Sequence, residues 1–142
     1  MKEKVIGFFG LGNMGMPICQ GMVKCGYKVI LPCFRPARTK EREDAINGMI
    51  EQGAQAATSQ KEMIEQCDIF MLSLPKSQQV EELVLAEDGI LKNAKPGTAI
   101  IDMTSADAAS TRMLAGLLEE KNIDILDCPV SGGVGGAAAQ TL

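Results

Sequence analysis

The feature that most constrains the fold is a glycine-rich turn near the N-terminus, Gly10-Leu11-Gly12-Asn13-Met14-Gly15. It follows the apolar run Val5–Phe9, which predicts a strand buried on both faces, and it opens a helical pattern over residues 14–25 that Gly26 ends. In this setting the first glycine permits a tight turn, the second lets backbone approach a pyrophosphate, and the third allows close helix–strand packing. N–H groups and the dipole at the helix start also favour phosphate. The turn therefore predicts a dinucleotide site, the alternative being a glycine-rich turn that binds nothing.

Apolar runs alternate with helical patterns along all 142 residues, which is typical of stacked βαβ units. We predict one domain over residues 1–142, with an α/β fold of the Rossmann type: a doubly wound, mainly parallel sheet with helices on both faces. Further strands are expected over residues 29–31, 54–57, 69–72, 99–101 and 123–126. Further helices are expected over residues 42–52, 60–66, 78–85 and up to about residue 120.

Two helix starts carry capping signals. Ser59 and Glu62 have the spacing of a capping box, and Thr104 or Ser105 is expected to cap the helix that follows the fifth strand. That helix is expected to bury its apolar side chains, namely Met113, Leu114, Leu117 and Leu118. A glycine-rich tail follows the sixth strand, and its end at Leu142 is expected to fall inside a further strand, which favours a fragment of a longer protein.

The loop after the second strand bears on the choice of cofactor. Sites for NAD usually place an Asp or Glu there, about 20 residues beyond the glycines, to bind the adenosine ribose. Here the loop contains Arg35 and Arg38, and the first carboxylate is Glu41. An arginine can pair with a 2′-phosphate and stack on adenine, so the loop favours NADP over NAD. The alternative is that both arginines are solvated surface charges.

Three further segments follow predicted strands, where the ligand crevice of such a sheet lies. Leu74-Pro75 and Thr104-Ser105 come after the fourth and fifth strands, and a hydroxyl there can contact ribose or substrate. Ser131-Gly132-Gly133 comes after the sixth strand, where a hydroxyl beside two unhindered N–H groups predicts a nest for a carboxylate. A helix cap and a flexible loop are the respective structural alternatives.

Composition excludes several other classes of function. The net charge of −4 gives no basic field for nucleic acid or an anionic membrane, and no apolar run reaches the length of a membrane span. The start of the chain, Met1 to Val5, lacks the apolar core of a signal peptide. There is no histidine, and the five cysteines are scattered, so we expect no metal site, reduced thiols and a cytoplasmic location.

Four blocks, in their order along the chain, resemble the β-hydroxyacid dehydrogenase family. They are GLGNMGMP with KCG downstream, SLP, IIDMTS and DCPVSGGVGGA. This family includes 3-hydroxyisobutyrate dehydrogenases, tartronate semialdehyde and glyoxylate reductases and, more distantly, 6-phosphogluconate dehydrogenase. One departure concerns the loop after the second strand, where NADP-dependent members often have Asn-Arg-Thr and this chain has Cys33-Phe34-Arg35-Pro36.

The resemblance also implies roles for individual residues. It adds Asn13, Met14, Leu74, Pro75, Gln79 and Ser105 to the glycine turn as cofactor contacts, and it makes Ser131, Gly132 and Gly133 the loop that binds the substrate carboxylate. It places the family's catalytic lysine, and an all-helical second domain, after Leu142. No catalytic residue is therefore expected in this chain. Lys76 is interpreted as a solvated charge, and Asp102 and Asp127 as carboxylates that bind local backbone.

These observations predict the cofactor-binding domain of an NAD(P)-dependent oxidoreductase. The intact enzyme would transfer hydride between the nicotinamide and a small 3-hydroxy acid or semialdehyde, and would be a homo-oligomer. A non-catalytic dinucleotide-binding or interaction module and an imine reductase-like enzyme are the alternatives. Neither nucleic acid nor a membrane is expected as a partner.

Overall fold

The computed structural model describes residues 3–142 as a six-stranded, wholly parallel sheet in the order β3-β2-β1-β4-β5-β6. Met1 and Lys2, which belong to the segment without a signal-peptide core, lie outside the described residues. The strands are β1 (Val5–Phe9), β2 (Lys28–Leu31), β3 (Gln55–Ala56), β4 (Ile69–Leu72), β5 (Ala99–Asp102) and β6 (Asp124–Asp127). The strand order reverses between β1 and β4, so the predicted doubly wound fold is confirmed, and its ligand crevice is expected at that point.

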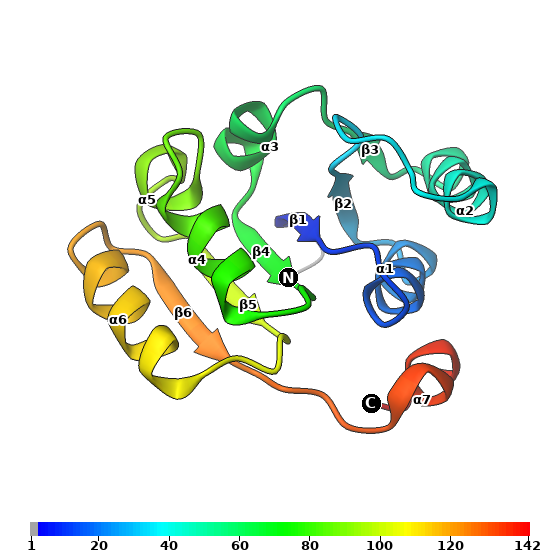
Figure 1. Cartoon of the computed structure of the whole chain (residues 1–142). Helices are drawn as coiled ribbons and strands as arrows, with labels where there is room; N and C mark the ends of the chain where they lie inside the picture. The colour runs from blue at the N-terminus through cyan, green and yellow to red at the C-terminus, as the bar shows by residue number, and fades with distance from the viewer. Residues whose placement is uncertain (1–2) are drawn as a thin grey trace.

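The helices form two layers on the sheet (Figure 1). They are α1 (Gly15–Lys24), α2 (Lys40–Glu51), α3 (Gln60–Gln66), α4 (Ser77–Leu85), α5 (Ile90–Asn93), α6 (Ala108–Glu119) and α7 (Gly133–Ala139). Helices α3 to α6 pack on one face, around Phe70, Leu72 and Ile100. Helices α1 and α2 pack on the other face, around Phe8, Val29 and Leu31. Each central strand is thus covered on both sides, which explains its continuous apolar sequence.

Two capping predictions have different outcomes. The Ser59 hydroxyl caps α3 as expected, accepting a hydrogen bond from the Glu62 N–H at 3.2 Å, and the Glu62 carboxylate accepts in return from Thr58. The prediction for α6 is wrong, because its cap is Asp107, whose carboxylate accepts from Ala109 N–H at 3.4 Å. Thr104 is buried three residues upstream, where its hydroxyl accepts a bond from another loop instead.

Helix α6 buries a narrower stripe than predicted. Leu114 and Leu118 are fully buried, whereas Met113 and Leu117 are 42% and 39% exposed. Residues four apart lie on the same face of a helix, so Leu114 and Leu118 share one face and Met113 and Leu117 share another. Only the pair 114 and 118 faces the sheet, and burial of all four side chains is therefore a wrong prediction.

The glycine-rich C-terminal segment also differs from expectation. Residues 133–139 form helix α7, and Thr141 and Leu142 belong to no strand, so the predicted strand at the chain end is absent from this part of the structure. Helix α7 packs against α1 (Figure 1). Gly21 of α1 allows this approach, because a Cβ there would lie 2.8 Å from the amide nitrogen of Gln140.

Candidate functional site

The glycine turn has the tight and crowded geometry that its sequence predicts. Gly10 has a φ of +100°, and a Cβ at this position would overlap the carbonyl oxygen of Ser73, which follows β4. A Cβ at Gly15 would overlap the Gly10 carbonyl oxygen and would lie 3.1 Å from the Ser73 Cβ. Gly10 therefore requires glycine for both its conformation and its close approach, and Gly15 requires it for the close approach alone.

Gly12 is different, because its missing side chain leaves open space. No heavy atom lies within 4 Å of a Cβ built at this residue. Its carbonyl accepts the first hydrogen bond of α1, from Met16 N–H at 3.0 Å. The residue before α1, Met14, provides no side-chain cap, and the first turn carries no acidic side chain. The start of α1 thus combines an open backbone with N–H groups that suit an anion.

A cleft of about 500 Å³ lies along this turn, at the carboxyl edge of the sheet. It is lined by residues from the turn, from the loop after β2, from α2, from the segment between β4 and α4, and from α4 itself. The structure brings eight of the predicted cofactor contacts together in its wall: Gly10, Leu11, Gly12, Arg35, Arg38, Leu74, Pro75 and Gln79.

The remaining predicted residues lie outside the lining. Asn13 and Ser105 are exposed, Met14 is half-buried, and Gly15 is buried beneath the turn. Ser131 and Gly132 lie in the connection between β6 and α7, and Gly133 is the first residue of α7. All three are exposed, with φ values of +126° and +61° at the two glycines. The structure therefore places the predicted carboxylate loop at the start of α7, outside the cleft lining.

The cleft has an uneven distribution of charge. Arg35, Arg38 and Arg42 line it on the side of the β2–α2 connection, and Glu82 and Asp88 line it on the side of α4. Arg42 was not predicted as a site residue. It belongs to the first turn of α2, and its Nη2 donates a hydrogen bond to the Asn13 Oδ1 at 3.0 Å. The charge run around it looks like a solvated helix face in the sequence, so only its contact with the glycine turn reveals its position.

A hydrogen bond also joins the two loops that follow β4 and β5. The Thr104 hydroxyl accepts from the Leu74 N–H at 3.1 Å, and the Asp102 carboxylate accepts from the Thr104 N–H at 2.9 Å. Asp102 is 1% exposed, and this burial raises the pKa of its carboxyl above the ordinary value. Its hydrogen bond to local backbone confirms the interpretation made from the sequence. Leu74 in the cleft wall is thus fixed to the end of β5.

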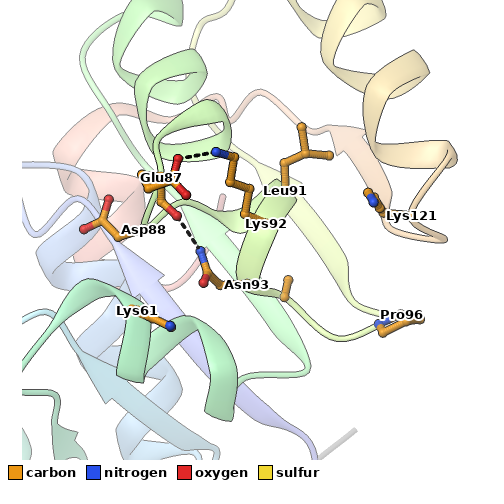
Figure 2. A pocket seen from close by; sticks show the side chains of 9 residues that line it. Lys61, Glu87, Asp88, Leu91, Lys92, Asn93, Pro96 and Lys121 are labelled. Atoms are coloured by element: carbon orange, nitrogen blue, oxygen red, sulfur yellow. Dashed lines mark hydrogen bonds and ion pairs between the residues drawn. The ribbon is translucent and has the colours of Figure 1, made fainter.

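A second hollow, of about 890 Å³, lies beside α5 (Figure 2). It is framed by α5 and by the residues that lead into β5 and β6. Polar side chains in this hollow bind one another or nearby backbone. Lys92 forms an ion pair with Glu87, and the Asn93 side chain donates a hydrogen bond to the Glu87 carbonyl at 3.0 Å. Nothing in this hollow matches the open N–H groups of the glycine turn, so it is not the candidate site.

Residues 3–142 include no cluster of three or more His, Cys, Asp or Glu side chains arranged to hold a metal ion. In the same part of the chain, no helix has the length and apolar character needed to cross a membrane. The five cysteines, Cys19, Cys25, Cys33, Cys67 and Cys128, are all free thiols.

Comparison with known proteins gives consistent matches over almost the whole chain. Residues 5–142 match the family model of the NAD binding domain of 6-phosphogluconate dehydrogenase. An NAD-dependent L-serine dehydrogenase of Pseudomonas aeruginosa is 37% identical over 139 residues, which are 98% of this chain and 44% of that protein. A 3-hydroxyisobutyrate dehydrogenase of the same organism is 38% identical over 137 residues, which are 96% of this chain and 44% of that protein.

A solved structure shares both fold and sequence. Psf3, determined in complex with NADP+ and 2-OPP, superposes with a TM-score of 0.79 at 28% identity, over 94% of this chain and 45% of that one. The chain thus spans less than half the length of these relatives.

Proposed function

Since the chain belongs to the β-hydroxyacid dehydrogenase family, we propose that it holds NAD or NADP in the cleft along the glycine turn. The single observation that carries this proposal is the turn itself. Gly10 and Gly15 are tightly enclosed, whereas Gly12 faces open space at the start of α1. The turn follows β1, next to the point where the strand order reverses, which is where open α/β sheets bind their ligands.

The chain's residues would position the cofactor rather than perform the chemistry. The N–H groups at the start of α1 would bind the pyrophosphate, and Leu74, Pro75 and Gln79 would line the path toward the nicotinamide. When bound, the nicotinamide supplies the hydride chemistry. We propose a small 3-hydroxy acid or semialdehyde as the substrate, with Ser131-Gly132-Gly133 as its carboxylate loop, and we assign the base to none of residues 1–142. We also propose that the intact enzyme is a homo-oligomer in the cytoplasm.

We further propose that NADP is preferred over NAD. The β2–α2 connection contributes two arginines and no carboxylate to the cleft lining, and a third arginine follows in α2. A carboxylate at this position would repel a 2′-phosphate, whereas an arginine can bind it through two parallel hydrogen bonds. Two features of the cleft lining thus support a preference for NADP: the β2–α2 connection contributes no carboxylate, and three arginines gather on that side.

Calorimetric titration of the 142-residue chain with NADP+ and with NAD+ tests both parts. We expect NADP+ to bind more tightly by about 1.5–3 kcal/mol, which is about 10- to 150-fold in Kd. Absence of binding by either dinucleotide would overturn the proposed function. Equal or tighter binding of NAD+ would overturn only the preference.

A further inference from the structure

We infer that Arg42 in α2 is the residue that determines specificity for the 2′-phosphate of NADP. The inference rests on the proposed function and assigns a role that neither the sequence motifs nor the comparisons give to this residue. It depends on three properties of Arg42: its place on a capped helix, its contact with the glycine turn, and the kind of partner that it has there.

The helix holds Arg42 more firmly than the loop holds the other arginines. Thr39 caps α2, its hydroxyl accepting from the Arg42 N–H at 3.3 Å, and its carbonyl accepts from Glu43 N–H at 3.1 Å. Arg42 is half-buried, whereas Arg35 and Arg38 are exposed in a connection without regular structure. An arginine that is already held in place loses less conformational entropy when it binds a ligand than a mobile one does.

The contact with Asn13 aims the guanidinium at the cofactor site. Nη2 of Arg42 lies 3.0 Å from Oδ1 of Asn13, in the turn that would bind the pyrophosphate. Asn13 and Arg42 are 29 positions apart in the sequence and meet because β1 pairs with β2, which brings together the segments that follow the two strands. In NADP the 2′-phosphate is attached to the adenosine ribose, which is joined to the pyrophosphate. A cation anchored at the glycine turn would therefore lie near the part of the ligand that carries the 2′-phosphate.

The partner of Arg42 leaves its charge available. Asn13 is a neutral amide, and the bond to it uses one of the five donors of a guanidinium. Lys40, in the same turn of α2, is exposed and pairs with Asp44 at 3.2 Å. The two carboxylates in the lining, Glu82 and Asp88, belong to the α4 side, and Asp88 accepts from the Gln60 side chain at 3.0 Å. Arg42 therefore combines a fixed position, a full charge and unused donors.

The experiment compares Arg42→Ala with two other variants in titrations with NADP+, NAD+ and adenosine 2′,5′-bisphosphate. Arg35→Ala/Arg38→Ala removes the two loop cations, and Arg112→Ala removes the same type of side chain from an exposed position in α6. We expect Arg42→Ala to weaken NADP+ and the bisphosphate at least tenfold and NAD+ less than threefold. The double variant should lose less NADP+ affinity than Arg42→Ala, and Arg112→Ala should match the wild type.

Arg42→Lys keeps a positive charge without the fork of donors and should give an intermediate loss. It also serves as the second variant if Arg42→Ala reduces folding, which a thermal melt by circular dichroism reports. Equal losses of NADP+ and NAD+ in the Arg42 variants, or a preference removed only by the double variant, would overturn the inference. In both cases the wild type still binds dinucleotide, which separates this result from failure of the proposed function.

Discussion

Replacing Gly12 by Val is the sharpest test of the glycine turn, because the structure predicts a small effect on stability and a large effect on cofactor binding. A Cβ at Gly12 meets no heavy atom within 4 Å, and its backbone is outside the positive-φ region that strains a side chain. Such a substitution changes the free energy of unfolding by about 1 kcal/mol or less, chiefly through the unfolded chain. At Gly10 or Gly15 the same change would overlap a backbone carbonyl oxygen and disrupt the turn.

The predicted effect on binding is much larger. The new side chain would fill the space through which the pyrophosphate reaches the N–H groups of α1. Hydrogen bonds to a charged group contribute about 1.5–3 kcal/mol each, so losing two of them weakens binding by about 3–6 kcal/mol. At about 1.4 kcal/mol for each factor of ten, Kd should rise by about 100- to 20,000-fold.

Calorimetric titration with NADP+ measures the loss of affinity, and urea denaturation measures the stability. Gly116→Val is the matched control, because Gly116 also has no heavy atom within 4 Å of a built Cβ and lies in α6, outside the cleft lining. The control should bind NADP+ like the wild type. Wild-type affinity in Gly12→Val would refute the assignment of the turn as the pyrophosphate site.

Three further predictions concern buried groups. Thr104→Val removes the acceptor of the Leu74 N–H and should lower the free energy of unfolding by about 1–3 kcal/mol, measured by urea denaturation. Burial raises the pKa of Asp102 above its ordinary value of 3.8, so the folded state retains this proton longer. Its contribution to stability therefore falls as the pH rises from about 3.8 through the raised pKa, and Asp102→Asn should remove this part of the slope. Burial also raises the pKa of Cys67 to about 12, so iodoacetamide at about pH 8 should label exposed Cys128 but not Cys67, as mass spectrometry will show.

Each of these predictions has an outcome that contradicts it. Unchanged stability in Thr104→Val would show that Leu74 finds another acceptor. An acid-range slope that is the same in Asp102→Asn and in the wild type would show that Asp102 does not titrate differently on folding. Labelling of Cys67 at the rate of Cys128 in the native protein would contradict its burial.

The positions of the strands and of the glycine turn could be predicted because the signals that specify them are local. Val5–Phe9 and Ile69–Leu72 are continuous apolar runs, and their bounds in the structure are those expected from the sequence. Gly10 and Gly15 have the restricted geometry that their motif predicts. A capping hydroxyl at Ser59 was also predicted correctly, because its partner lies three residues away.

The cap of α6 shows where local signals failed. Thr104 and Asp107 are both good caps by residue type, so the sequence does not choose between them. In the fold, the Leu74 N–H lies next to Thr104 because β4 and β5 are neighbours, and the hydroxyl accepts that bond instead. The helix then begins after Asp107.

The sequence by itself determined the alternation of strands and helices, the dinucleotide turn and the family. Its periodicity and its glycines act within a few residues, and they specify each βαβ unit before the units pack. Only the tertiary structure decided which arginine meets the turn, because Arg42 reaches Asn13 through the pairing of β1 with β2 and not through any spacing along the chain. The same holds for α7, whose position against α1 depends on the contact of Gly21 with Gln140, more than a hundred residues apart. Contacts of this kind depend on how the layers pack, and a one-dimensional pattern does not encode that packing.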